Sequence, residues 1–480
     1  MTAPSLLWFR QDLRLADNPA LMAAAAGPLL PVFVLDDQAA GGWAPGGAAR
    51  WWLHHSLAAL GAALAARGAP LFLLRGRAEI LIPGLAQAIG AKEVFASRLY
   101  EPWARERDRR IAEALAADGR QLRLATSAVL MEPARFAAGS GKPYAVYTPF
   151  ARALAATGDP PSPLPTPTVL AGLPQPPDGL ALATLDLLPR RDWAAGFAAH
   201  WQPGEAGAAA RLTGFLAGPI AAYGAARNTP GVAGTSGLSP HLHWGEMSPR
   251  SLWHAVRAAL PQPGVLGPQS RAWPFLSELL WREFSYHLLW HHPSLPDAPL
   301  RPRFAEFPWA PKPALLRAWQ RGRTGLPIVD AGLRELWQTG WMHHRVRMIA
   351  ASLLVKHLLQ PWQDGAAWVW DTLVDADLAA NSASWQWVAG CGSDAAPYFR
   401  IFNPVLQGEK FDPAGDYVRR YVPELARLPA KWLHRPREAP AAVLDAAGLR
   451  LGLDYPRPIV DLAEGRARAL AAFATLGTPA

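Results

Sequence analysis

The chain contains a single cysteine, Cys391, among its 480 residues. One cysteine excludes a disulfide framework and any metal cluster built from several thiolates, and it fits a reducing compartment. The first residues, MTAPSLLWFRQDLRL, lack the basic segment and long apolar run of a signal peptide. Apolar runs such as LLPVFVL are too short to cross a bilayer. A cytoplasmic protein without a membrane partner is therefore expected.

Two common cofactor and metal motifs are also missing. No G-x-G-x-x-G sequence occurs, so dinucleotide binding in the first part of the chain is not supported, and no H-E-x-x-H sequence occurs. The adjacent His343 and His344 cannot share one helix face, which favours packed or hydrogen-bonding histidines over metal ligands. No metal site is expected.

Positive charge and tryptophan are plentiful. The formal net charge of +9 favours a polyanionic partner, nucleic acid first, although a chain can be basic without one. Sixteen of the 22 tryptophans lie after residue 200. Tryptophan is an ordinary core residue, but this uneven distribution asks for a further reason.

The first part of the chain alternates short apolar runs with helical patterns. The runs predict buried strands at 5–9, 29–35, 70–76, 93–97 and 122–125, with helices at 18–26, 47–68, 79–90 and 101–119. This alternation predicts an α/β fold with a doubly wound parallel sheet. Proline then gathers between residues 157 and 191, and helical patterns follow residue 200. We predict an α/β domain at 1–130, an extended linker at 131–200 and an all-α domain at 201–475.

Two polar motifs are candidates for ligand binding. Around Gly237, the hydroxyls of the TSGLS sequence (235–239) suit a phosphate, but the same pattern is typical of an ordinary helix cap. A predicted helix further along carries on one face Glu278, Trp281, Arg282 and Ser285. An acid beside a tryptophan suits a nucleobase, and the alternative is a surface ion pair with a core tryptophan.

The segment VDADLAANSASWQW (374–387) combines acids, an amide and tryptophans. Asp377, Asn381 and Trp385 recur every four residues and so form one helical stripe. Such a stripe suits a flat polar heterocycle, whereas helix capping explains one of the two acids better than both. Arg345 and Arg347 fall on different faces of an earlier helix, so one of them is expected to face solvent or phosphate.

Together these segments resemble the photolyase/cryptochrome family. The similarity is most specific in WREF, GLPIVDAGLRELWQTGWMH, DADLAAN, WQW, PYFRIFNP and QGEKFD, which occur in family order. WWLHHSL, SGLSPHL and GDYVRRYVPEL are most similar to bacterial cyclobutane pyrimidine dimer photolyases related to plant cryptochromes. The resemblance implies a Rossmann-like first domain and a helical domain that binds FAD.

The resemblance also implies roles for individual residues. FAD contacts are implied for Tyr223, Thr235, Ser236, Gly237, Leu238, Ser239, Arg347, Asp375, Asp377 and Asn381. An electron route to the flavin is implied for Trp385, Trp362 and Trp309. Contacts with the lesion or the surrounding DNA are implied for Glu278, Trp281, His344, Met348, Trp387, Arg227, Arg345, Arg400 and Gln407.

The implied activity is that of a deoxyribodipyrimidine photo-lyase, a carbon–carbon lyase. Photoexcited reduced FAD donates an electron to a flipped-out pyrimidine dimer in DNA, the ring splits and the electron returns. The family's alternatives are a cryptochrome photoreceptor and a (6-4) photolyase, the latter because His344 matches one of its two histidines while Met348 replaces the other. A basic, tryptophan-rich nucleic-acid-binding protein is the non-enzymatic alternative. A monomer is expected.

A second, light-harvesting chromophore is also typical of the family. The segment YEPWARERD lacks the Asn-Glu pair of some folate-binding members and has Trp103 and Ala104 there instead. A differently bound folate, a deazaflavin, or no antenna all remain open.

Overall fold

In a computed structural model of the chain, the structure describes residues 3–262, 264, 266–395, 397–398 and 400–477. The described chain divides into two compact units. The first unit comprises Met1–Ala217, Ser236–Pro293 and Val374–Ala380, and the second comprises Gly218–Thr235, Ser294–Leu373 and Asn381–Ala480. The domain limits expected at residues 130 and 200 follow sequence composition and remain predictions.

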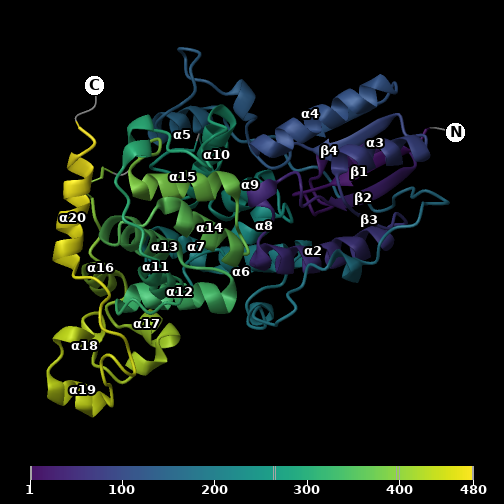
Figure 1. Cartoon of the computed structure of the whole chain (residues 1–480). Coiled ribbons are helices and arrows are strands. Elements are labelled where there is room, and N and C mark those ends of the chain that lie inside the picture. Colours follow the sequence, from purple (N-terminus) through teal and green to yellow (C-terminus); the bar gives the residue numbers. More distant parts are fainter. Residues whose placement is uncertain (1–2, 263, 265, 396, 399, 478–480) are drawn as a thin grey trace. The chain divides into compact units, whose positions relative to one another are not determined.

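A five-stranded parallel sheet organises the first unit (Figure 1). Its strands are β1 (Ser5–Phe9), β2 (Leu29–Leu35), β3 (Phe72–Arg75), β4 (Glu93–Ser97) and β5 (Gln121–Ala125). Their order is β3-β2-β1-β4-β5, which places Trp8 of β1 between Val32 and Ala96. All five predicted strands are confirmed. The inner strand β1 and its neighbour β2 are buried almost throughout and apolar, whereas the edge strand β5 has no fully buried residue.

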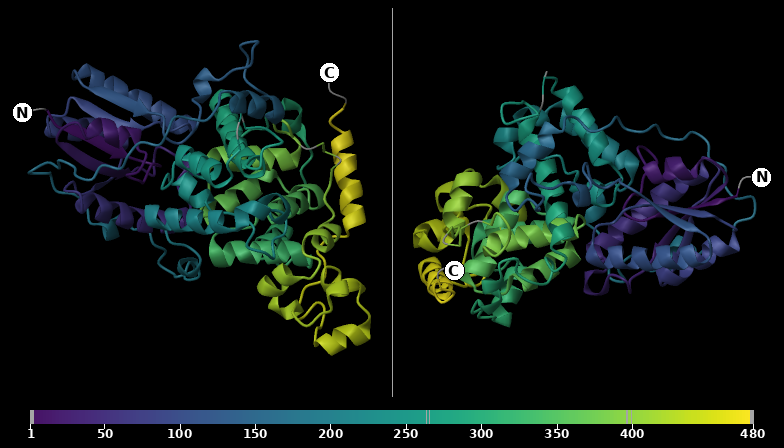
Figure 2. Two further views of the ribbon diagram at one scale, coloured as in Figure 1. Left: turned by 180° about the vertical axis from the view of Figure 1, so that it is seen from behind. Right: turned by 90° about the horizontal axis from the view of Figure 1, so that it is seen from above.

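The connecting helices are α1 (Pro19–Ala24), α2 (Gly47–Ala65), α3 (Ala78–Ala88) and α4 (Pro102–Ala117). Figures 1 and 2 show α2 on one face of the sheet and α3 with α4 on the other, as in a doubly wound fold. Asn18 caps α1 by accepting a hydrogen bond from the Leu21 amide. Gly68 and Gly119, which follow α2 and α4, adopt positive φ. These helices therefore end at Ala65 and Ala117, slightly before the predicted ends at 68 and 119.

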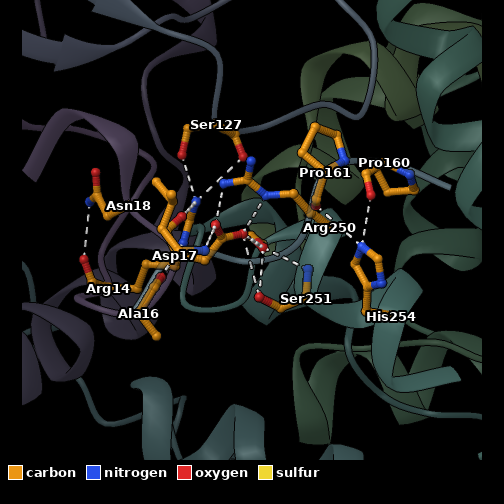
Figure 3. A network of polar contacts seen from close by, with 12 residues as sticks. Arg14, Ala16, Asp17, Asn18, Ser127, Pro160, Pro161, Arg250, Ser251 and His254 are labelled. Carbon is orange, nitrogen blue, oxygen red and sulfur yellow. Dashed lines mark hydrogen bonds and ion pairs between the residues drawn. The ribbon is translucent and has the colours of Figure 1, made fainter. Parts of the chain in front are cut away.

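The segment expected to be an extended linker is fastened to the first unit at Asp17 (Figure 3). The buried Asp17 carboxylate accepts hydrogen bonds from Arg250, and the Leu164 amide donates to it at 2.9 Å. His254, one helical turn after Arg250, donates from Nε2 to the Pro160 carbonyl at 2.8 Å. The proline-rich chain is thereby held along the helix that carries both basic residues.

The segment 131–200 also contains helix α5 (Tyr147–Ala156) and short 3-10 turns. The other helices of the first unit are α6 (Glu205–Ala217), α8 (Ser239–His243), α9 (Pro249–Ala259) and α10 (Trp273–His291). The 3-10 turns of this unit are η1 (Gly41–Trp43), η2 (Pro133–Arg135), η3 (Leu182–Leu185) and η4 (Phe197–Ala199). Helix α10 packs against α5 and α9.

The second unit is mostly helical, as predicted. It contains α7 (Pro219–Ala226), α11 (Pro313–Gln320), α12 (Pro327–Thr339), α13 (His344–Ser352), the π-helical turn η6 (Leu353–His357), α14 (Trp362–Thr372), α16 (Pro404–Phe411), α17 (Asp416–Tyr421), α18 (Ala430–Leu433), α19 (Ala441–Ala447) and α20 (Leu462–Ala474). Its 3-10 turns are η5 (Pro302–Glu306), η7 (Pro423–Leu425) and η8 (Pro436–Glu438). Helix α15 (Leu378–Ala389) begins in the first unit and ends in the second. Proline opens several of these helices, where its missing N–H costs nothing.

Among the described residues, no helix combines the length and apolar character needed to cross a bilayer. In the same residues, no group of three or more His, Cys, Asp or Glu side chains is arranged to hold a metal ion.

Candidate functional site

Asp375 and Asp377 have different partners within the first unit. Ser239 donates from Oγ to Asp375 Oδ2 at 2.6 Å. Asp377 Oδ1 accepts from the Ala380 amide at 2.8 Å and caps α15, while its Oδ2 accepts from the Tyr286 hydroxyl at 2.5 Å. The capping alternative therefore holds for Asp377, whereas Asp375 is bound to the predicted phosphate-side turn.

The buried Asp377 carboxylate is held in its ionised form. Burial alone would raise its pKa, but His243, with Nδ1 at 3.7 Å, and the nearby Arg282 lower it to about 2. Tyr286 adds a hydrogen bond, and the carboxylate in turn raises the pKa of that phenol, after burial itself. A buried anion fixed in this way is an acceptor for hydroxyl or ring N–H donors.

The predicted 235–239 turn forms around a left-handed glycine. Gly237 has φ +62°, a left-handed conformation that favours glycine, and the nearest atom to a Cβ there would be Nη1 at the flexible end of Arg211. Ser236 Oγ accepts from the Leu238 amide at 3.3 Å. The helix that follows, α8, has only five residues. Thr235, the first residue of the predicted 235–239 segment, belongs to the second unit.

The polar face of α10 carries a partly exposed tryptophan. The Trp281 ring stacks on Tyr147 of α5, with centroids 3.6 Å apart and planes 7° apart. Arg282 donates to the Ala128 carbonyl at 2.6 Å and to the Tyr286 hydroxyl at 3.3 Å. Trp281 is therefore not a core residue, and Arg282 is directed toward Tyr286. Glu278 is partly buried on the same helix.

Arg345 and Arg347 both lie on helix α13 of the second unit and have different partners. Arg345 donates to Asn228 Oδ1 at 2.6 and 3.2 Å, and its guanidinium lies 4.6 Å from the centre of the Phe411 ring. Arg347 instead donates to the Met342 carbonyl at 2.7 Å. The predicted divergence of these two side chains is confirmed by the contacts of each.

The histidines at the start of α13 stay neutral at physiological pH. His343 accepts from the Arg345 amide and caps the helix. His344 is accessible, yet the protein around it desolvates its ring, and this together with Arg347 and Arg227 lowers its pKa to about 3. Desolvation likewise lowers the pKa of His343 to about 4. Neither ring holds a transferable proton near pH 7.

The tryptophans of the predicted electron route lie in the second unit. Trp385 is buried and packs on Gly365 of α14 so closely that an added Cβ there would stand 2.2 Å from its ring. Trp362, one turn before Gly365, is also buried, and Trp309 is partly exposed with the Phe307 ring 4.4 Å away. The order from buried to partly exposed agrees with the predicted route.

The remaining predicted residues are spread over several elements. Asn381 donates from Nδ2 to the Ala366 carbonyl at 3.4 Å. Arg227 lies 5.5 Å from the ring of the buried Tyr223, and Arg400 is exposed. Partly exposed side chains are those of Met348 on α13, Trp387 on α15 and Gln407 on α16. Phe399 of the PYFRIFNP motif lies outside the described residues.

Four residues in these contacts were missed by sequence reasoning: Tyr147, Asn228, His243 and Tyr286. Tyr147 falls in the segment assigned to the linker, and Asn228 and His243 have no neighbours in sequence that signal their tertiary partners. Tyr286 was detectable in principle, because it follows Arg282 by one helical turn on the motif already singled out.

Comparison with known proteins identifies the family of this chain. Residues 5–168 match the family model described as DNA photolyase, and residues 275–475 match the FAD binding domain of DNA photolyase. The deoxyribodipyrimidine photo-lyase of Agrobacterium fabrum is 48% identical over 478 residues, covering 99% of this chain and 98% of that protein. The chain belongs to the photolyase/cryptochrome family.

Other relatives span both branches of the family. Cryptochrome-1 of Arabidopsis thaliana is 40% identical over 97% of this chain and 69% of that protein. The crystal structure of a bacterial class III photolyase from Agrobacterium tumefaciens superposes with a TM-score of 0.95 at 47% identity, covering 99% of this chain and 98% of that one. An archaeal photolyase from Sulfolobus tokodaii with two FAD molecules gives 0.82 at 25% identity, covering 98% of this chain and all of that one.

These matches confirm the predicted family, the combination of a parallel-sheet part with a helical part, and an FAD-binding domain. The predicted enzyme class agrees with the name of the Agrobacterium fabrum relative. The residue roles above, and the identity of any antenna, remain predictions.

Proposed function

We propose that this protein repairs cyclobutane pyrimidine dimers in DNA, using light absorbed by bound FAD. The observation that carries the proposal is the face of α10, where the partly exposed Trp281 is set flat on Tyr147, one turn from Glu278. A rigid aromatic plane beside an acid suits a base that has left the helical stack. The near full-length similarity to a deoxyribodipyrimidine photo-lyase supports the same assignment.

The polar groups of each unit fit the parts of FAD that the proposal needs. In the first unit, Asp375 with Ser239 and the ionised Asp377 offer acceptors for ribityl or ribose hydroxyls and ring N–H groups. In the second unit, Arg347 and Asn381 would lie toward the isoalloxazine. Bound FAD, reduced and excited by light, would supply the electron for ring splitting.

The protein's own groups would bind and orient the lesion. Glu278 would hydrogen-bond the dimer, and Trp281 and Trp387 would pack against its rings. A dimer stacks poorly with its neighbours, so its extrusion costs less than that of intact bases. Phosphates on either side would meet Arg227, Arg345, Arg400 and Gln407, in keeping with the positive net charge.

The residues at positions 344 and 348 support the cyclobutane dimer over the (6-4) photoproduct. Repair of the (6-4) lesion requires proton transfer, and the family resemblance implies two histidines for it, of which this chain has His344 alone. Met348, at the second position, has no proton to give. We assign His344 a hydrogen-bonding role beside the dimer.

A blue-light photoreceptor is the second candidate, favoured by the 40% identity to Cryptochrome-1 of Arabidopsis thaliana. The presence of Asn381, where the resemblance places the photolyase-type residue, supports repair instead. Photoreceptor function does not require the α10 face to be complete.

Repair of defined oligonucleotides tests the proposal. The reduced, flavin-loaded protein should restore a thymine cyclobutane dimer under blue light and leave a (6-4) lesion intact, and Glu278→Gln should repair more slowly. Dark incubation is the control. Absence of dimer repair by flavin-loaded protein would favour the photoreceptor, and restoration of the (6-4) lesion alone would reverse the assignment of His344.

A further inference from the structure

A lysine is buried in the second unit within the π-helical turn η6. Lys356 is only 1% exposed. Its Nζ donates to the carbonyls of Ala389 and Tyr398, each at 3.3 Å, and lies 3.3 Å from the centre of the Tyr398 ring. Single π-helical turns insert an extra residue into a helix and are frequent at functional sites. One ammonium thus joins two segments far apart in sequence.

The two carbonyls adjoin residues assigned to DNA. Ala389 is the last residue of α15, two positions after Trp387, and Tyr398 stands two positions before Arg400. One turn before Lys356, Ser352 Oγ accepts from the Phe402 amide at 3.3 Å. Arg400 therefore lies in the chain between Tyr398 and Phe402, and these two residues are bound by Lys356 and Ser352 of one helical segment.

The Tyr398 ring is fixed by a second stacking partner. It stacks on Phe473 of α20, with centroids 4.5 Å apart and planes 5° apart. The ring also has the Phe307 ring 5.4 Å away and the Phe304 ring 6.2 Å away, and the Lys356 ammonium adds a charged contact to these aromatic ones.

Opposing effects act on the charge of Lys356. The carbonyls and the ring favour the ammonium form, whereas burial lowers its pKa to about 7. Of the titratable neighbours, the Cys391 thiol has its pKa raised by burial to about 12, burial also raises the pKa of the Tyr398 phenol, and desolvation lowers that of His357 to about 4.

Two arginines contact backbone carbonyls next to this cluster. Arg301 donates to the Gly390 carbonyl, and Arg468, from α20, donates to the His357 carbonyl. Neither arginine changes charge near neutrality, and neither do the three titratable neighbours. Lys356 is thus the group of this cluster that titrates there.

We propose that Lys356 is a positioning residue for lesion recognition, whose ammonium ties the carboxyl end of α15 to Tyr398 and so sets Trp387 and Arg400 for the damaged strand. The inference rests on the proposed DNA-repair function. Protonated Lys356 holds both carbonyls through charge-assisted hydrogen bonds below about pH 7, and the tie weakens as pH rises through that value, because the neutral amine keeps N–H donors but loses the charge. Preference for damaged DNA should therefore fall from pH 6 to pH 9.

Equilibrium binding of dimer-containing and intact duplexes, at constant ionic strength between pH 6 and pH 9, tests this inference. The wild-type ratio of the two affinities should fall about tenfold with a midpoint near 7, since misplacement of a contact group by about 1 Å has effects of this order or larger. Lys356→Met should show the low ratio at every pH, with KM for repair raised and kcat retained. Lys431→Met, which removes an exposed lysine over the Trp432 ring, is the matched control and should follow the wild type.

A wild-type ratio that stays constant from pH 6 to pH 9 would overturn the inference, even if Lys356→Met does not fold. So would a folded Lys356→Met that keeps the wild-type ratio and pH profile. If the wild type shows no preference for damaged DNA at any pH, the proposed repair function fails and this inference falls with it.

Discussion

Asp375 and Asp377 stand two residues apart and have separate tasks. Asp377 closes the first turn of α15 and binds Tyr286, so its removal affects the protein itself. Asp375 contacts the hydroxyl of the exposed Ser239, on the turn that the family resemblance assigns to FAD. Asp377 supports the helix, whereas Asp375 binds the turn that we propose to contact FAD, so the two acids differ in what they hold.

Asp377→Asn should make stability less dependent on acid pH. The folded-state pKa of about 2 lies below the ordinary value of 3.8, so ionised Asp377 stabilises the protein above pH 4 and this contribution is lost as pH falls through about 2. The shift corresponds to about 2 kcal/mol at neutral pH. Denaturant unfolding should show the variant less stable at pH 7 and the gap narrowing below pH 4. Asp178→Asn, at an exposed acid, is the control; a gap independent of pH would contradict the assignment.

Trp281→Ala should weaken the preference for damaged DNA. A stacked aromatic side chain is worth roughly 1–3 kcal/mol per base, or about fivefold to a hundredfold in affinity. Trp290→Ala, on the same helix but assigned no DNA contact, is the control for loss of an indole. Titration of damaged and intact duplexes measures the ratio, and unchanged selectivity in Trp281→Ala would remove Trp281 from the lesion site.

Among the helices, α14 and α15 meet where Trp385 of the predicted electron route packs on Gly365. Gly365 lets the Trp385 ring approach the α14 backbone, and Trp362 is one turn away on the same helix. The glycine is therefore required by a close approach, because its φ is unexceptional and only the space is restrictive.

Trp385→Phe should abolish light-driven reduction of bound flavin and spare repair by protein that is already reduced. Phenylalanine stays aromatic but lacks the outer indole atoms Cη2 and Cζ3 that approach Gly365, and it is much harder to oxidise than tryptophan. Trp319→Phe, at a buried ring 6.4 Å from Trp385, is the matched control because no role in the route is assigned to it. The flavin absorption spectrum under blue light reports reduction, and normal photoreduction in Trp385→Phe would exclude this route.

At the scale of single elements, apolar periodicity and capping patterns in the sequence predicted strands, helices and helix ends. The five strands and four helices of the first part followed from apolar periodicity, and capping explained Asp377. The strand order and the stacking of Tyr147 on Trp281 are tertiary, and no window of sequence contains them. Lys356 was overlooked because it interrupts the apolar run LLVKHLL and has partners more than thirty residues away.

For the molecule as a whole, the net charge of +9 is the property most directly tied to the DNA substrate that we propose. Charge alone does not select a lesion, because phosphate contacts are the same along any sequence. Selectivity has to come from the stacked and hydrogen-bonding groups, while the arginines supply affinity.

Arg345→Ala should flatten the salt dependence of DNA binding by about one unit at most in the log–log slope, with equal losses for damaged and intact duplexes. Its guanidinium is held in place by Asn228 and Phe411, so the side chain is already positioned before DNA binds. Arg190→Ala, at an exposed arginine in the proline-rich segment, should leave the slope unchanged. An unaltered slope for Arg345→Ala, or a loss confined to damaged DNA, would argue against a phosphate contact.

The order of synthesis gives the Asp17 network a further meaning. The buried Asp17 leaves the ribosome 233 residues before Arg250, its partly exposed cationic partner. At about 5–20 residues per second, this acid waits on the order of tens of seconds for that partner. All five strands of the sheet have been synthesised long before Arg250 is available to pair with Asp17. Nascent chains stalled shortly after residue 217 should therefore be cleaved more readily by protease near Asp17 than chains stalled well beyond Arg250, and equal resistance would show that the sheet needs no help from α9.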